Sequence, residues 1–164
     1  MKPSQYTRDF LETLLFVADN PDEDARPLED KSIFDFSPEF VEAVETFVYG
    51  FQTFLANHYP ELHVRSDECQ RSFGGNVFFS LSGHGCGFFD EWTENPETGH
   101  NDGSLGDALQ SALVEFAGGN KYRFEQLESN LSENDDGKID LSFIPSAIAE
   151  YRKKYFSDGV KFAE

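Results

Sequence analysis

Residues 37–59, SPEFVEAVETFVYGFQTFLANHY, contain the clearest helical pattern of the chain. Ser37 is a favourable N-cap, Pro38 suits the first helical position, and Glu39 places negative charge in the first turn. Pro60 should end the helix. Apolar residues recur every three or four positions, so we expect them to lie in the core rather than to form an aromatic surface for a ligand. They are Phe40, Val41, Val44, Phe47, Val48, Phe51, Phe54 and Leu55.

Helices are also expected on both sides of this segment. Residues 5–18 have apolar positions at helical spacing, and the acidic, proline-containing stretch 20–30 should be an exposed loop. Residues 104–117 begin with Ser-Leu-Gly-Asp, which resembles a capping box, and the two glycines that follow should close the helix. A last helix should begin at Pro145, with an inward face formed by Ile148, Tyr151 and Tyr155.

Two hairpins are expected between these helices. Residues 76–81 are rich in Phe and Val and suit a strand, with residues 87–92 as its partner. The glycines between them would supply positive φ in the connecting turn, Gly83 to Gly87. Residues 122–125 alternate in polarity, and residues 138–143 would pair with them across an acidic turn.

This order of elements favours an α+β fold, with a small antiparallel sheet made of two hairpins and packed by three to four helices. The length of 164 residues suits one domain over residues 1–164. Residues 142–164 should form a C-terminal helical extension of that domain. We expect one core that contains Phe47, Phe51, Phe79, Leu109 and Phe124.

The chain is strongly acidic, with 31 Asp and Glu against 13 Lys and Arg and a formal net charge of −18. Such a surface repels nucleic acid and anionic membranes, although solubility or adaptation to high salt would explain it too. The 49 residues between Arg71 and Lys121 contain no Lys or Arg. No apolar run is long enough to cross a membrane and no signal segment is evident, so an intracellular protein is expected, with Cys69 and Cys86 as reduced thiols.

The glycine-rich stretch FFSLSGHGCGFFDE, residues 78–91, invites a chemical interpretation. A metal could use side chains from this stretch and the residues after it, and Cys86 could act as a nucleophile with a histidine. The spacing matches no established metal or nucleophile motif, however, and a hydrogen bond from His84 to Asp90 would explain the histidine as a structural clamp. The metal candidates are His84, Cys86, Asp90, His100 and Asp102.

The segment ENDDGKIDL, residues 133–141, partly matches a calcium-binding EF-hand loop. In that register Ser132 and Phe143 occupy the first and last positions, where the ion requires carboxylates. Asp-Gly between strands is a turn signal instead. No phosphate-binding loop or nucleophile elbow is present. We therefore assign no catalytic residue, no metal and no cofactor.

The order of these motifs resembles a family of small, mostly uncharacterised bacteriophage proteins. In that family a strand precedes Gly-His-Gly-x-Gly-Phe-Trp-Asp, and a Leu-Gly-x-x-Leu helix follows. The chain departs from the pattern at Cys86, at Phe89 in place of Trp, and by the polar insertion 93–103. The resemblance implies a phage origin and the cytoplasm of the infected host cell, but no activity. The matching residues are Gly83, His84, Gly85, Gly87, Phe88 and Asp90.

Charge and family together favour a binding protein that inhibits or redirects a host nucleic-acid-binding protein, such as a defence protein. Its carboxylates would imitate nucleic-acid charge and bind the basic surface of that partner, without direct contact to nucleic acid or membrane. A metal- or thiol-dependent enzyme using the His84 and Cys86 loop, or a phage structural or assembly protein, is the alternative. The expected partner-binding residues are Asp90, Glu91, Glu94, Glu97, Asp102 and Asp107.

Overall fold

The structure, a computed structural model, describes residues 2–18, 28 and 30–157. Most of the acidic stretch 20–30 and the end of the C-terminal extension therefore lie outside the described residues. The described part contains six α-helices and two separate antiparallel sheets of two strands each, which confirms the α+β class. The helices are α1 (Gln5–Ala18), α2 (Pro38–His58), α3 (Pro60–Arg65), α4 (Phe73–Ser80), α5 (Ser104–Phe116) and α6 (Pro145–Phe156). The strands are β1 (Thr93–Glu94), β2 (Asn101–Asp102), β3 (Leu131–Glu133) and β4 (Ile139–Leu141).

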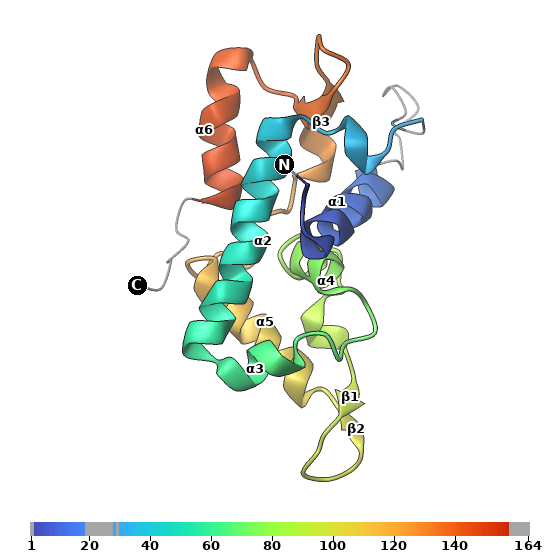
Figure 1. The fold of residues 1–164 in the computed structure, drawn as a ribbon, viewed down its shortest axis with the longest axis vertical. Coiled ribbons are helices and arrows are strands. Elements are labelled where there is room, and N and C mark those ends of the chain that lie inside the picture. Colours follow the sequence, from blue (N-terminus) through green and yellow to red (C-terminus); the bar gives the residue numbers. More distant parts are fainter. Residues whose placement is uncertain (1, 19–27, 29, 158–164) are drawn as a thin grey trace.

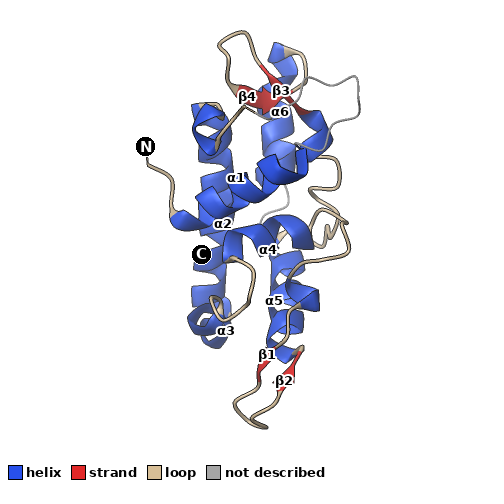
Figure 2. Ribbon diagram, turned by 90° about the vertical axis from the view of Figure 1, so that its right-hand side faces the viewer, coloured by secondary structure: helices blue, strands red, loops and turns tan. Residues whose placement is uncertain are grey.

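The two sheets lie at opposite ends of an elongated molecule. Figure 1 places the β1–β2 hairpin at its lower end and the β3–β4 hairpin, with the start of α6, at its upper end. Figure 2 shows the helices filling the space between the two pairs of strands. None of the helices in the described ranges combines the length and the apolar character that a bilayer crossing requires.

Helix α2 forms as its sequence predicts and supplies the centre of the core. The Ser37 hydroxyl accepts a hydrogen bond from the backbone N–H of Phe40, and the helix ends at His58, just before Pro60. Its apolar face packs on the aromatic rings of Phe36, Phe73, Phe116, Phe124 and Phe156. The Phe47 ring lies 5.2 Å from both the Phe116 and Phe124 rings.

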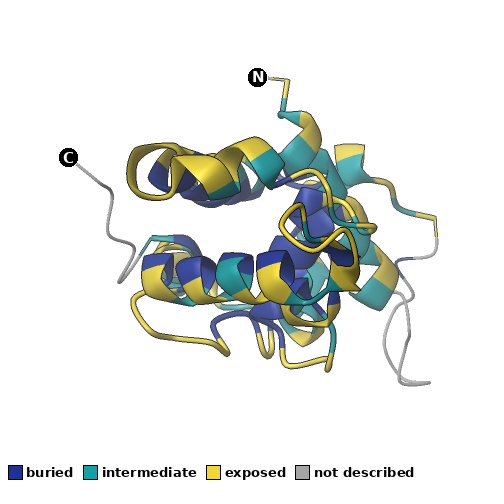
Figure 3. Ribbon diagram, turned by 90° about the horizontal axis from the view of Figure 1, so that it is seen from below, coloured by how far each residue is buried: buried dark blue, intermediate teal, exposed yellow. Residues whose placement is uncertain are grey.

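The predicted core residues are buried with two exceptions, of which the first is Val41 in α2, which is half-buried. Phe47, Phe51, Leu109 and Phe124 are fully buried. Phe79 is only half-buried, although it packs against the edge of the core. Figure 3 shows buried residues on the inner faces of the longer helices and exposed residues on their outer faces.

The predicted strand over residues 76–81 is wrong, because this segment is helix α4. The Ser72 hydroxyl accepts from the backbone N–H of Gly75 and caps the helix. A Cβ atom on Gly74 would lie 1.9 Å from the carbonyl oxygen of Tyr6, so only glycine lets α4 approach the backbone of α1 this closely. Buried on almost every side, the segment shows no polar face by which a helix could be recognised from its sequence.

The first predicted hairpin is absent as well. Residues 87–92 hold a short 3-10 helix, η2 (Phe88–Asp90), in place of a strand, and the loop from Gly83 to Gly87 joins α4 to η2 rather than two strands. The backbone conformation of the glycines is nevertheless as predicted, with φ of 79°, 77° and 151° at Gly83, Gly85 and Gly87. The polar insertion after η2 contains the hairpin that the sequence did not indicate, β1–β2.

The second hairpin exists with a different partner. Residues 122–125 form turns instead of the predicted strand, and β4 pairs with β3, residues 131–133. Between the strands the Asn134 side-chain oxygen accepts from the backbone N–H groups of Asp136 and Lys138, and Gly137 has a φ of 74°. The segment is therefore the predicted turn and not a calcium loop.

Helices α5 and α6 occupy their predicted places, with one correction at the start of α5. Gly103 occupies the N-cap position and has no side chain that could cap the helix. The Ser104 hydroxyl, which was expected to cap it, donates to the Asp102 carboxylate instead. The predicted capping box between Ser104 and Asp107 is thus wrong. In α6, Tyr155 is buried, as expected, and Ile148 and Tyr151 are half-buried.

Helix α6 is joined to the core by two buried side chains. Arg123 donates to the carbonyl oxygens of Tyr155 and Ala117, at the ends of α6 and α5. Asp140 is 3% exposed and accepts from Ser37 and from the Arg152 guanidinium. The C-terminal extension is therefore part of the packed molecule as far as residue 157.

Candidate functional site

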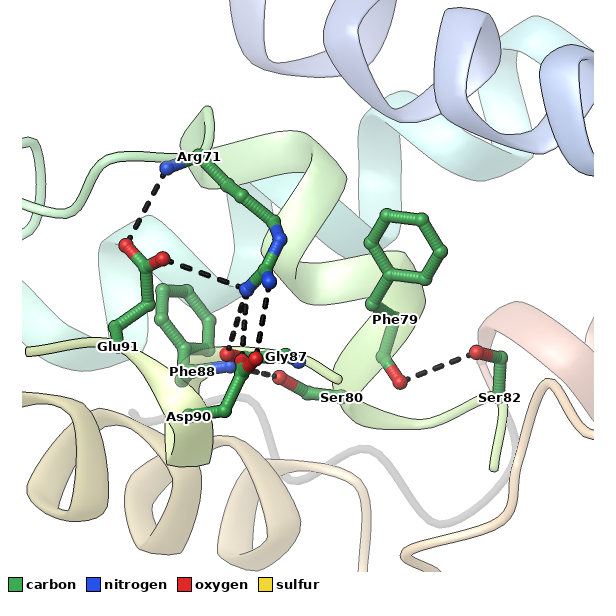
Figure 4. Close-up of polar contacts among 8 residues, drawn as sticks. All are labelled: Arg71, Phe79, Ser80, Ser82, Gly87, Phe88, Asp90 and Glu91. Atoms are coloured by element: carbon green, nitrogen blue, oxygen red, sulfur yellow. Dashed lines mark hydrogen bonds and ion pairs between the residues drawn. The ribbon is translucent and has the colours of Figure 1, made fainter. Parts of the chain in front are cut away.

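The predicted glycine motif is held against the end of α4. A Cβ atom on Gly87 would lie 2.5 Å from the Ser80 hydroxyl oxygen and 2.7 Å from the Ser80 Cα. That hydroxyl accepts from the backbone N–H of Phe88 at 2.8 Å, and the Phe88 ring is fully buried. Gly87 and Phe88 therefore have a packing role. Figure 4 shows both residues beside Ser80, with the hydrogen bond from Phe88 to Ser80 as a dashed line.

Helix α5 packs on the other side of η2 through a second glycine. A Cβ atom on Gly106 would lie 2.2 Å from the carbonyl oxygen of Phe88 and 2.9 Å from that of Glu91. Leu105 and Leu109, on either side of it, are buried. The Leu-Gly-x-x-Leu pattern thus has a structural meaning, because it lets α5 touch the backbone of the motif directly.

Arg71 joins the two acids at the end of the motif. Its guanidinium donates to both carboxylate oxygens of Asp90, at 2.7 and 2.9 Å, and to Glu91 at 3.3 Å (Figure 4). Asp90 also accepts from the backbone N–H of Gly87. The Arg71 hydrogen bonds, reinforced by this amide, hold the pKa of Asp90 below its ordinary value against the opposing effect of burial.

His84 does not bond to Asp90, so the predicted clamp has the wrong partner. Its Nε2 lies 2.7 Å from an Oε1 of Glu128, in the segment before β3. Tyr122 lies under the same loop, 3.6 Å from where a Gly83 Cβ would be. The exposed part of the glycine loop is therefore docked onto residues 122–128, which are 35 or more positions away in sequence.

The two cysteines are free and their thiols are not activated. Burial raises the pKa of Cys86, and the opposing effect of Arg71 is smaller. Burial and the neighbouring Glu91 raise the pKa of Cys69 to about 12. Because the thiolate is the nucleophile, both side chains are poorly suited to nucleophilic catalysis at neutral pH.

The predicted metal candidates are not brought together. Asp90 is bound by Arg71, His84 by Glu128, and Asp102 by Asn95 and Ser104. In the ranges that the structure describes, no three His, Cys, Asp or Glu side chains are grouped so that they could hold an ion.

The six predicted partner-binding acids divide into two sets. Asp90 and Glu91 belong to the Arg71 network, and Glu91 is only 4% exposed, so the expectation that the whole segment is exposed is wrong there. Asp102 accepts from the Ser104 hydroxyl and from Asn95, and these hydrogen bonds lower its pKa. These three carboxylates hold the fold of the segment.

The other three carboxylates are Glu94, Glu97 and Asp107, and all three are exposed. Among the described residues none of their side chains makes a hydrogen bond or an ion pair. Sequence reasoning could not separate the two sets, because Arg71 lies 19 residues before Asp90 and only the fold selects that pairing.

Comparisons of the chain with family models, with curated proteins and with solved structures found no match. The resemblance to the phage family stays a prediction, and a proposal of function has to rest on the surface of the molecule itself.

Proposed function

We propose that this chain is a phage-encoded acidic binding protein that inhibits or redirects a host nucleic-acid-binding protein by binding its basic surface. The observation that carries the proposal is a set of exposed carboxylates at the β1–β2 end of the molecule that have no partner in the described part of the chain: Glu94, Glu97 and Asp107. An isolated surface carboxylate adds little to stability, so a field that attracts a basic partner is the better explanation of this set.

The nearest cations in the sequence do not neutralise these acids. Arg65 donates to Glu68 at 2.9 Å, and Arg71 is bound to Asp90 and Glu91. The next Lys or Arg along the chain is Lys121. The negative field of this end is therefore open to solvent and reaches a partner over about 10 Å at 0.1 M salt.

The alternative of a thiol- or metal-dependent enzyme receives less support. Its proposed nucleophile, Cys86, has a raised pKa and makes no hydrogen bond to His84 in the described residues. The Glu128 carboxylate that binds His84 could orient a catalytic base, but no nucleophile is joined to that base. A site for acyl or metal chemistry requires such groups to converge on one reacting atom, which these do not.

The first test replaces the three open carboxylates together, as Glu94→Gln, Glu97→Gln and Asp107→Asn. The immobilised variant and wild type are compared for capture of proteins from a nuclease-treated bacterial lysate across a salt series. We expect the triple variant to capture the partner about tenfold less well, with a shallower salt dependence, and duplex DNA to displace the partner from wild type.

The matched control is Asp135→Asn, Asp136→Asn and Glu150→Gln, which removes three exposed acids near the opposite end of the molecule. Both variants lose the same net charge. Equal loss of capture by the two would mean that only overall charge matters, and a captured protein that DNA does not displace would contradict mimicry.

A further inference from the structure

An open groove of about 700 Å³ lies beside the unpaired acids, between α3, the β1–β2 hairpin and the first turns of α5. This volume falls within the range of about 300–1,000 Å³ that ligand-binding clefts occupy. Its apolar lining comes from Pro60, Leu62, Val64, Pro96, Leu105 and Ala108.

Val64 is the residue that most needs an explanation. It is 81% exposed, although α3 could have carried a polar residue at no cost to packing. Leu62 beside it is half-buried and Leu105 is buried, so the apolar surface continues from the core to the outside. An apolar lining of this kind, in a groove bordered by polar residues, can receive the apolar side chains of a partner.

The charge of the groove selects the kind of partner. Glu61 and Glu97 line it, both exposed and without a hydrogen bond or ion pair from their carboxylates in the described part of the chain. The cation that lines it, Arg65, donates to Glu68 and to the carbonyl oxygen of Glu94. The charge left unmatched is therefore negative.

We propose that this groove binds a protein segment that presents an apolar face flanked by Lys or Arg. The apolar lining would receive leucine-sized side chains, and the two glutamates would bind the flanking cations. The inference deepens the proposed function and rests on it for the basic character of the partner. A second copy of this chain is a poor occupant, because its own net charge is −18.

The test uses two fluorescein-labelled helical peptides of about 18 residues with the same lysines, one with leucine and one with alanine on its apolar face. We expect wild type to bind the leucine peptide about tenfold more tightly than the alanine peptide at about 0.1 M NaCl. Equal affinity for the two peptides overturns the proposal.

The Val64→Asp variant distinguishes binding in the apolar groove from attraction by the overall negative charge of the protein. It adds a negative charge, so attraction by charge alone predicts equal or tighter binding of the leucine peptide, whereas the groove predicts about tenfold weaker binding. Val64→Ser, which adds no charge, should weaken it in the same direction. The matched control, Ile144→Asp, changes another exposed apolar residue, 70% exposed and just before α6, and should bind like wild type.

The outcomes distinguish the two proposals. If the Glu94, Glu97 and Asp107 variant binds both peptides weakly while Val64→Asp binds like wild type, the groove is excluded and the acidic binding function stands. If neither variant weakens binding, both fail. A concentration-dependent increase in the mass of wild type that Val64→Asp abolishes would assign the groove to a second copy and overturn the proposal.

Discussion

At Asp90 one carboxylate serves two structural partners. It accepts two parallel hydrogen bonds from the Arg71 guanidinium and one from the backbone N–H of Gly87. Gly87 has a φ of 151°, a backbone conformation that glycine adopts readily. The position of the glycines could be predicted from sequence because positive φ is a local property of glycine. The position of Arg71 could not, because a long-range ion pair is selected only when the chain is folded.

Replacing Asp90 by Asn should lower the free energy of unfolding by about 1 kcal/mol at pH 7, a modest loss because the pair is partly exposed. The folded-state pKa of Asp90 is lowered, so its contribution is complete above the unfolded pKa of about 3.9 and is lost as the pH falls through the folded value. Urea unfolding of both proteins from neutral to acid pH should therefore show a difference that shrinks on acidification.

Glu97→Gln is the control for this series, because Glu97 is exposed, lies outside the helices and has an unpaired carboxylate in the described structure. It should leave unfolding close to wild type at every pH. A difference between Asp90→Asn and wild type that stays constant down to acid pH would mean that the ion pair is not its source.

Among the elements, the long amphipathic helices were predictable and the short buried ones were not. Helix α2 alternates apolar and polar residues at helical spacing, whereas α4 is only eight residues long and buried nearly throughout. A short apolar run fits a buried strand as well as a buried helix. The position of α4 is decided by its contact with α1, and no local pattern contains that contact.

That contact predicts an asymmetry between two neighbouring glycines. Gly74→Ala would place Cβ against the Tyr6 backbone, which cannot move without shifting α1, so we expect a loss of about 3 kcal/mol or more in the free energy of unfolding. At Gly75 the nearest atoms are the hydroxyl oxygens of Ser72 and Thr13, at 2.8 and 3.0 Å. These side chains can rotate where the backbone cannot, although rotation of Ser72 would give up its cap of α4.

Gly75→Ala therefore serves as the comparison, with an expected loss of no more than about 1 kcal/mol, because the better helix propensity of alanine offsets part of the cost of disturbing the Ser72 cap. Thermal and urea unfolding of the two variants measure the difference. Similar stability for both would contradict the close approach of α1 and α4.

For the whole molecule, the excess of 31 acids over 13 Lys and Arg makes self-repulsion the main long-range electrostatic effect. Raising NaCl from about 0.02 to about 0.5 M should then stabilise the fold, by about 1 kcal/mol, because screening weakens repulsion between distant exposed charges more than it weakens the partly buried pairs. The urea midpoint at the two salt concentrations gives the measurement.

The Asp135, Asp136 and Glu150 triple variant carries less negative charge and should gain less from salt than wild type. A midpoint that falls as salt rises would show instead that ion pairs such as Arg152–Asp140, at 2.6 Å, outweigh the repulsion.

The contact between Gly106 and the backbone of Phe88 has a consequence for how such a chain can diverge. The glycine motif before the insertion and the Leu-Gly-x-x-Leu helix after it touch each other through their backbones. Neither motif can therefore change alone without disturbing their packing. The insertion between them, residues 93–103, forms a hairpin that projects from the end of the molecule (Figure 1). The tip of this hairpin can vary in length and charge without disturbing the contact between Gly106 and Phe88. Selection would thus preserve the residues of this contact, whereas the proposed partner-binding hairpin could change in sequence as its partner changes.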